Sequence, residues 1–201
     1  MSIYSIILSA GRSERMGMLK AFLRFDEQFT FIEKLLSVYS FTDEIITVVN
    51  NEVLNDDRWS KTACINSENV KVVLNTIPEL GRFHSVKLGI KNLTSKNFVH
   101  GDSCFIQNID NPFTNRSITE ALIKTNIELG YALPVCNDTG GHPVLIASDV
   151  MNFIRDSNEK DCNFRELLSV FKRTEIKVSE DKILANVNSA DDYRNYFPYK
   201  I

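Results

Sequence analysis

The sequence has no excess of basic residues, no long apolar run and no closely paired cysteines. Its 201 residues carry 23 Lys and Arg against 26 Asp and Glu, a net charge of -3. Nucleic-acid binding needs a basic surface that contacts the phosphate backbone, so this balance argues against a nucleic-acid partner. No apolar segment approaches the roughly 20 residues that span a bilayer. No basic leader precedes the apolar N-terminal residues, so we expect no membrane partner and a cytoplasmic location.

The spacing of the cysteines argues against a zinc site. The four cysteines are scattered along the chain at Cys64, Cys104, Cys136 and Cys162. Zinc sites usually show closely spaced ligands, and no C-x-x-C pair is present, so we expect no zinc site but free thiols in a reducing cytosol. Because 43% of the residues are hydrophobic, the core needs no disulfide or structural metal, and we expect one domain over residues 1–201.

Apolar segments of strand length alternate with segments of helical periodicity. We expect strands at residues 3–10, 44–49, 70–74, 104–109, 131–135, 143–146, 174–178 and 183–187. We expect helices at residues 31–39, 51–60, 85–93, 114–129, 149–155 and 164–171, and from Ser189 onward. This alternation predicts a three-layer α/β/α, Rossmann-like fold with a mostly parallel central sheet. Ligands of such sheets bind beyond the carboxyl ends of the strands, so the segments that follow strands matter most.

The segment after the first expected strand has the composition of an anion-binding loop. Residues 8–20 read L-S-A-G-R-S-E-R-M-G-M-L-K. Gly11 allows backbone N–H groups to approach an anion closely. Arg15 can bind two oxygens of one phosphate, and Lys20 supplies a positive charge where negative charge develops in a transition state. The spacing matches neither the dinucleotide pattern G-x-G-x-x-G nor the P-loop G-x-x-x-x-G-K-[ST], which disfavours a Rossmann oxidoreductase.

These residues carry a family resemblance. The segment resembles the signature L-A-A-G-x-S-x-R-M-G-x-x-K of the MobA-like NTP transferases, which include the molybdenum cofactor cytidylyltransferases and guanylyltransferases. Ser9 departs mildly from this signature, and Ala10 is more similar to the cytidylyl branch, which favours CTP as the substrate. The resemblance implies a nucleotidyltransferase fold, a catalytic role for Arg15 and Lys20, and nucleotide contacts from Leu8, Ser9, Ala10, Gly11, Arg12 and Ser13.

Two further segments resemble the nucleotide and metal sites of the same family. Residues 81–89, G-R-F-H-S-V-K-L-G, resemble its G-x-x-x-S-L-x-x-G segment, which lies at a helix start and faces the nucleotide base; this implies nucleotide contacts from Gly81, Arg82 and Ser85 on the side of the base. A helix cap at Ser85 is the alternative. Asp110, followed by Asn-Pro, resembles the metal-binding Asp of D-x-P, and Asn188 resembles a second Mg²⁺ contact. Carboxylate and amide oxygens suit this hard cation. A turn at Asp110 and a helix cap near Asn188 explain the same residues without a metal.

Three residues are expected on the acceptor side. His142 belongs to G-G-H-P-V-L, which resembles the family's G-H-P-V-x-F segment, although a structural hydrogen bond is equally compatible. Asp161 and Arg165 keep the spacing of the cytidylyl branch's G-D-x-G-x-R-x-L-L, but the glycines are missing, and a helix start accounts for them equally well.

The resemblance implies a Mg²⁺-dependent enzyme that moves an NMP, CMP in preference, from an NTP to a phosphorylated small-molecule acceptor and releases pyrophosphate. The first hypothesis is an activity like that of the molybdenum cofactor cytidylyltransferases. A cytidylyltransferase for a sugar, alditol or choline phosphate is the alternative, and R-x-x-S-V at residues 82–86 favours it. A non-catalytic nucleotide-binding regulator is the alternative of another class. The sequence leaves the oligomeric state open.

Overall fold

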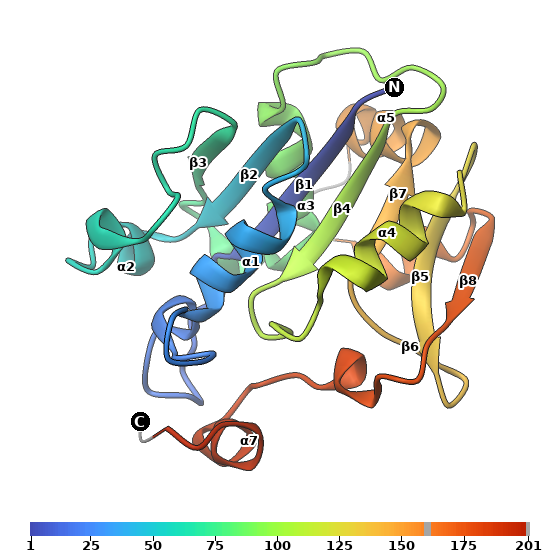
Figure 1. The fold of residues 1–201 in the computed structure, drawn as a ribbon. Helices are drawn as coiled ribbons and strands as arrows, with labels where there is room; N and C mark the ends of the chain where they lie inside the picture. The colour runs from blue at the N-terminus through green and yellow to red at the C-terminus, as the bar shows by residue number, and fades with distance from the viewer. Residues whose placement is uncertain (159–161, 200–201) are drawn as a thin grey trace.

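A twisted, mostly parallel sheet organises the molecule (Figure 1). The computed structural model describes residues 1–158 and 162–199. The strands run in the order β3-β2-β1-β4-β7-β5-β6, and β8 pairs with β5. The strands are β1 (Ile3–Ser9), β2 (Glu44–Val49), β3 (Val70–Leu74), β4 (Ser103–Asn108), β5 (Tyr131–Cys136), β6 (Thr139–Gly140), β7 (Val144–Ala147) and β8 (Arg173–Lys177).

Helices cover both faces of this sheet. The α-helices are α1 (Phe31–Tyr39), α2 (Asn51–Leu54), α3 (Gly81–Asn92), α4 (Arg116–Lys124), α5 (Ser148–Asp156), α6 (Phe164–Leu168) and α7 (Ala190–Tyr196). The 3-10 helices are Lys20–Phe22, Trp59–Lys61, Pro78–Leu80 and Asp181–Leu184. Within the described ranges 1–158 and 162–199, no helix is both long and apolar enough to cross a membrane.

The sheet divides into a parallel part and a mixed part. Strands β3, β2, β1 and β4 pair in parallel, and so do β5 and β8. Strand β7 is antiparallel to both β4 and β5. A parallel connection needs a crossover of a dozen or more residues, and the segment between β5 and β7 is too short for one. The α/β fold with a mostly parallel sheet is therefore confirmed, and each antiparallel strand pairing involves β6 or β7.

Alternating side chains of the central strands form two cores. On one face, Ile7 of β1 packs in a cluster with α1 and α4 residues such as Leu35 and Leu122. On the other face, Ile6 of the same strand packs in a cluster with α3 and α5 residues such as Val86. Successive side chains of a strand point to opposite faces of the sheet, so a continuously apolar strand is buried on both faces. This is the physical basis of the three layers.

Five expected elements differ from the structure by three or more residues. Two of these are helices with shifted ends: the helix expected at residues 85–93 begins at Gly81, and the helix expected at residues 164–171 ends at Leu168. Residues 183–187 are not a strand: a 3-10 helix occupies Asp181–Leu184, and an extended segment follows. The expected helix at residues 51–60 divides into α2 and the 3-10 helix Trp59–Lys61. The helix expected at residues 114–129 ends at Lys124, because Asn126 adopts a positive φ of 46° that a right-handed helix does not allow.

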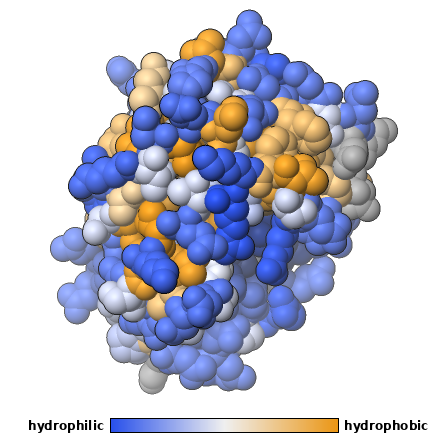
Figure 2. All heavy atoms as spheres, turned by 90° about the vertical axis from the view of Figure 1, so that its right-hand side faces the viewer, coloured by the Kyte–Doolittle hydropathy of each residue, from blue (hydrophilic) through white to orange (hydrophobic). Residues whose placement is uncertain are grey.

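One edge of the sheet is protected by charge. Figure 2 views the molecule from the right-hand side of Figure 1 and shows apolar side chains in separate patches among hydrophilic ones. On the edge strand β8, the exposed positions are Arg173, Glu175 and Lys177. Charged side chains on an edge strand disfavour pairing with a further strand.

Candidate functional site

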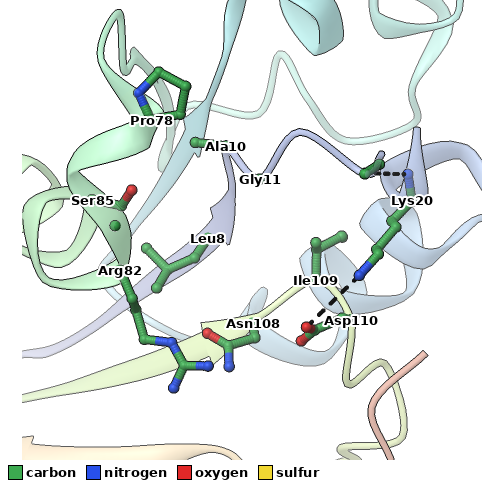
Figure 3. Close-up of a pocket in the computed structure, with 12 residues that line it drawn as sticks. Leu8, Ala10, Gly11, Lys20, Pro78, Arg82, Ser85, Asn108, Ile109 and Asp110 are labelled. Carbon is green, nitrogen blue, oxygen red and sulfur yellow. Dashed lines mark hydrogen bonds and ion pairs between the residues drawn. The ribbon is translucent and has the colours of Figure 1, made fainter. Parts of the chain in front are cut away.

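The carboxyl ends of β1 and β4 open into a cavity of about 240 Å³ (Figure 3). It is lined by Leu8, Ala10, Gly11, Ser13, Lys20, Pro78, Gly81, Arg82, Ser85, Asn108, Ile109 and Asp110. Segments far apart in the sequence therefore meet here: the loop after β1, the start of α3 and the end of β4. This is the end of the sheet where a ligand is expected.

The loop after β1 is a structured turn. The carbonyl of Ser13 accepts hydrogen bonds from the N–H groups of Met16 and Gly17, at 2.9 and 3.2 Å. Met16 is buried and anchors the loop in the core. From the end of β2, the Asn50 side chain donates to the Ala10 carbonyl at 3.3 Å. These bonds hold the loop at the mouth of the cavity.

The expected loop residues do not all lie in that cavity. Ser9 is buried in β1, and Arg12 pairs with Glu79 at 3.3 Å. Arg12 and Arg15 line an adjoining hollow of about 340 Å³ together with Lys20 and Asn188. Arg15 forms no hydrogen bond or ion pair with any residue in the described ranges, so its guanidinium is free to bind an anion there.

Lys20 links the loop to two distant parts of the chain. Its ammonium donates a hydrogen bond to Asn188 Oδ1 at 2.6 Å and lies 3.9 Å from Asp110 Oδ2. Burial lowers the pKa of Lys20, Asp110 opposes this shift, and the neighbouring Arg15 adds to it. The ammonium thus has two oxygen partners and a second cation nearby, at a point facing both hollows.

The C-terminal segment is tied to β4 by backbone and amide contacts. The Val187 N–H donates to the Asp110 carbonyl at 2.7 Å. The buried Asn111 side chain donates to the carbonyls of Ile183 and Ala185 at 2.8 and 2.6 Å. These bonds replace the strand pairing expected at residues 183–187, and they bring Asn188 beside Asp110.

The α7 cap fixes Asn188 from its other side. Asp192 accepts hydrogen bonds from the N–H groups of Asn188 and Ser189, both at 2.9 Å. Ser189 in turn caps α7, as the side chain receives the Asp192 N–H at 3.2 Å. The cap expected near Asn188 is therefore present, and it leaves the Asn188 amide oxygen directed to Lys20.

The start of α3 forms the opposite wall. The helix begins at Gly81, where φ is 80° and ψ is -170°, a conformation that only glycine adopts without strain. Ser85 lies in the second turn and so is not the helix cap; its hydroxyl receives a hydrogen bond from Asn75 Nδ2 at 3.0 Å. Arg82 lines the cavity and, in Figure 3, extends toward Asn108.

Asn108 lines the cavity although its position in the sequence did not predict a site residue. It is the last residue of β4, and its amide nitrogen contacts His142 Nε2 at 3.2 Å. A polar residue at the carboxyl end of a strand, two positions before the expected metal ligand Asp110, was a signal that could have pointed to Asn108. Burial lowers the pKa of His142 to about 4, and the charge of Arg82 adds to this effect. His142 is therefore neutral at physiological pH and borders the cavity through Asn108.

The oxygen donors at the end of β4 fit a divalent cation. Asp110 Oδ1 is buried and has no hydrogen-bond partner among residues 1–158 and 162–199. Those residues contain no group of three or more His, Cys, Asp or Glu side chains that could hold a metal by themselves. Mg²⁺ usually keeps water and substrate phosphate ligands beside one or two protein oxygens, so Asp110 and Asn188 suit it better than a metal that needs a full protein cage.

Of the other two residues expected on the acceptor side, the structure describes Arg165 alone, and Arg165 does not line this site. Arg165 is exposed on the short helix α6 and lines neither hollow. Its backbone N–H donates to the Asn163 side chain, so the helix cap that the sequence allowed is present. Asp161 lies outside the described residues.

Comparisons with known proteins identify the family of this chain. The model of the family "MobA-like NTP transferase domain" matches residues 5–176. The molybdenum cofactor cytidylyltransferase of Escherichia coli (strain K12) is 24% identical over 196 residues, which are 96% of this chain and 94% of that protein. The probable molybdenum cofactor guanylyltransferase of Clostridium perfringens (strain SM101 / Type A) is 27% identical over 126 residues, which are 61% of this chain and 55% of that protein.

The fold also has a counterpart among solved structures. The crystal structure of Rv0371c from Mycobacterium tuberculosis H37Rv superposes with a TM-score of 0.75 at 17% sequence identity, and all of both chains is covered. At this identity the likeness concerns the fold alone.

Proposed function

The chain belongs to the family of MobA-like NTP transferase domains, and from this premise we propose that it transfers CMP from CTP to a phosphate-bearing small molecule. Membership makes it a nucleotidyltransferase; the base, the acceptor and the need for Mg²⁺ are the proposal. The observation that carries it is the convergence of Lys20, Asp110 and Asn188 beside the anion-binding loop.

The reaction follows from the positions of these groups. An oxygen of the acceptor phosphate attacks the α-phosphorus of the NTP and forms a new P–O bond. The bond between the α-phosphorus and the bridging oxygen of the β-phosphate breaks, and pyrophosphate leaves with the electron pair. A phosphate oxygen is already a nucleophile, so no general base is required. The protein contributes positioning and charge stabilisation.

Each charged group has a separate task in this scheme. Arg15, which lines the adjoining hollow and has no hydrogen-bond partner in the described part of the chain, binds the phosphates that leave as pyrophosphate. Lys20 stabilises the charge that accumulates around the α-phosphorus. Asp110 and Asn188 would hold Mg²⁺, which neutralises phosphate charge when bound. The loop from Leu8 to Ser13 binds the phosphates, which all NTPs share.

The base and the acceptor are proposed on narrower grounds. Ala10 lines the cavity and is similar to the cytidylyl branch, and the relative matched over 96% of this chain is a cytidylyltransferase. We propose molybdopterin as the acceptor because both relatives are named as molybdenum cofactor nucleotidyltransferases. A sugar, alditol or choline phosphate is the alternative acceptor, since R-x-x-S-V at residues 82–86 is placed at the cavity wall. The four free thiols suit a cytoplasmic reaction.

A nucleotide panel tests the proposal. Thermal unfolding is measured with CTP, GTP, ATP and UTP, with and without Mg²⁺, because a ligand of the folded state raises apparent stability. We expect the largest shift with CTP and Mg²⁺. No shift with any nucleotide would contradict the assignment.

Pyrophosphate release with molybdopterin and with sugar, alditol and choline phosphates then identifies the acceptor. We expect release with one of these classes. Nucleotide binding without release for every acceptor would instead favour a non-catalytic nucleotide-binding regulator.

A further inference from the structure

The side chain of Asn108 presents one unpaired oxygen to the cavity. Asn108 is only 6% exposed, yet it lines the cavity. Its amide nitrogen is engaged by His142 Nε2 at 3.2 Å, and no residue in the described ranges donates a hydrogen bond to its Oδ1. Polar atoms of such enclosed side chains normally have a partner, so this oxygen is suited to a ligand donor.

His142 contacts the nitrogen end of the Asn108 amide. In this orientation the Asn108 nitrogen donates to His142 Nε2, which requires a neutral imidazole with its proton on Nδ1; burial lowers the pKa of His142 to about 4 and keeps the ring neutral. The amide oxygen then faces a cavity that also contains the cationic groups of Arg82 and Lys20, which favour the negative end of the amide dipole. In Figure 3 this oxygen lies on the Leu8 side of the Asn108 amide.

The position of Asn108 indicates the donor it meets. Gly81 and Ser85 line the cavity on the side proposed for the base, and Lys20 and Asp110 line it on the side proposed for the phosphates. Asn108 lies between these groups, at the end of β4 (Figure 3). In a nucleotide the ribose joins base and phosphates, and its hydroxyl groups are hydrogen-bond donors.

We infer that Asn108 Oδ1 accepts a hydrogen bond from a ribose hydroxyl of the bound NTP, and that His142 is the positioning residue that orients the Asn108 amide. This inference rests on the proposed nucleotidyl transfer. It assigns selection of ribonucleotides over deoxyribonucleotides to a side chain at the end of β4 and a side chain in the connection between β6 and β7.

The test compares the affinities of CTP, 2′-deoxy-CTP and 3′-deoxy-CTP by titration calorimetry with Mg²⁺, and the matching GTP series in parallel. The full chain should bind the ribonucleotide about fivefold or more tightly than one of its deoxy analogues, because that analogue leaves the Asn108 oxygen unpaired. Asn108→Leu has a similar volume and no acceptor. It should remove the discrimination by weakening only ribonucleotide binding, and the exposed Asn97→Leu should preserve it.

His142 variants separate positioning from structural support. His142→Phe removes the acceptor for the Asn108 nitrogen and should reduce the ribonucleotide preference. His142→Gln offers a carbonyl in its place and should restore most of that preference. A general loosening of the site would lower the affinities of all three nucleotides alike, and His142→Gln would not restore them.

The outcomes distinguish this inference from the proposed function. Equal binding of CTP or GTP and both its deoxy analogues overturns the role of Asn108 while nucleotide binding stands. Full discrimination in a folded Asn108→Leu also overturns it. If the full chain binds none of the nucleotides, the proposed function and this inference both fail.

Discussion

The ammonium of Lys20 lies 2.6 Å from Oδ1 of Asn188, a residue 168 positions further along the chain. The same ammonium lies 3.9 Å from the carboxylate of Asp110. Side-chain exposures of 12% for Lys20 and 22% for Asp110 place this contact out of bulk water, where electrostatic interactions are stronger. The lysine of the loop after β1 therefore interacts directly with both expected metal ligands.

Removal of the Lys20 charge should abolish turnover without unfolding the protein. We expect Lys20→Ala to lower kcat by about 100-fold or more, because a cation that stabilises transition-state charge is lost. Pyrophosphate release measures the effect, and circular dichroism checks the fold. The exposed Lys124→Ala is the matched control and should retain activity. Near-wild-type turnover of Lys20→Ala would remove Lys20 from the catalytic group.

Substitutions of the two expected metal ligands, Asp110→Asn and Asn188→Asp, should change the affinity for Mg²⁺ in opposite directions. Asp110→Asn removes the anionic ligand and should raise the Mg²⁺ concentration for half-maximal nucleotide binding by about tenfold or more. Asn188→Asp adds a carboxylate and should lower that concentration, since carboxylates are stronger ligands of Mg²⁺. The exposed Asp57→Asn should change neither. Chelation with EDTA should abolish turnover and added Mg²⁺ restore it; full activity in EDTA would exclude the metal site.

Asn111 should contribute to both stability and metal affinity. Its amide donates to two carbonyls of the C-terminal segment, at Ile183 and Ala185. Asn111→Ala leaves both carbonyls without this donor and should reduce the free energy of unfolding by about 2–3 kcal/mol. Urea denaturation measures this loss, and Asn97→Ala, at an exposed position, serves as the control.

The Asn111 substitution also tests how Asn188 is positioned. Because the C-terminal segment carries Asn188 to Asp110, Asn111→Ala should weaken Mg²⁺-dependent nucleotide binding as well. Lower stability with unchanged binding would mean that the segment is held by other contacts.

The buried imidazole of His142 should make stability depend on pH. Its pKa in the folded protein is about 4, below the ordinary 6.5. Between these values the unfolded chain binds a proton that the folded chain does not, so stability is complete above about pH 6.5 and declines as pH falls. From pH 7 to pH 5 the expected loss is at most about 2 kcal/mol.

A variant comparison isolates the contribution of His142. Urea denaturation at pH 7 and pH 5 should show a smaller loss for His142→Gln than for the wild-type protein. The exposed His100→Gln should lose as much as wild type. Equal pH dependence in all three proteins would show that His142 does not titrate in this window.

Strand and helix positions were largely readable from the sequence because burial on two faces imposes a distinctive pattern. The ranges expected for β2, β3 and α1 are those of the structure. The error at residues 183–187 has a different origin. Most of these residues are apolar, and Ile183 and Val187 are β-branched. However, the Asn111 side chain, not a neighbouring strand, donates hydrogen bonds to the carbonyls of Ile183 and Ala185. No local pattern reveals whether an extended segment will find a strand partner.

The sequence by itself determined the chemistry of the loop at residues 8–20, the acid at the end of β4 and the family resemblance, since these depend on residue types at short spacing. The tertiary structure decided which of these groups meet. In the folded chain Asn188 accepts a hydrogen bond from Lys20, and the Asn108 amide contacts His142. Ser85 is hydrogen-bonded to Asn75 and is not the helix cap. Such contacts depend on strand register and on hydrogen bonds between distant segments, and neighbouring residues do not encode them.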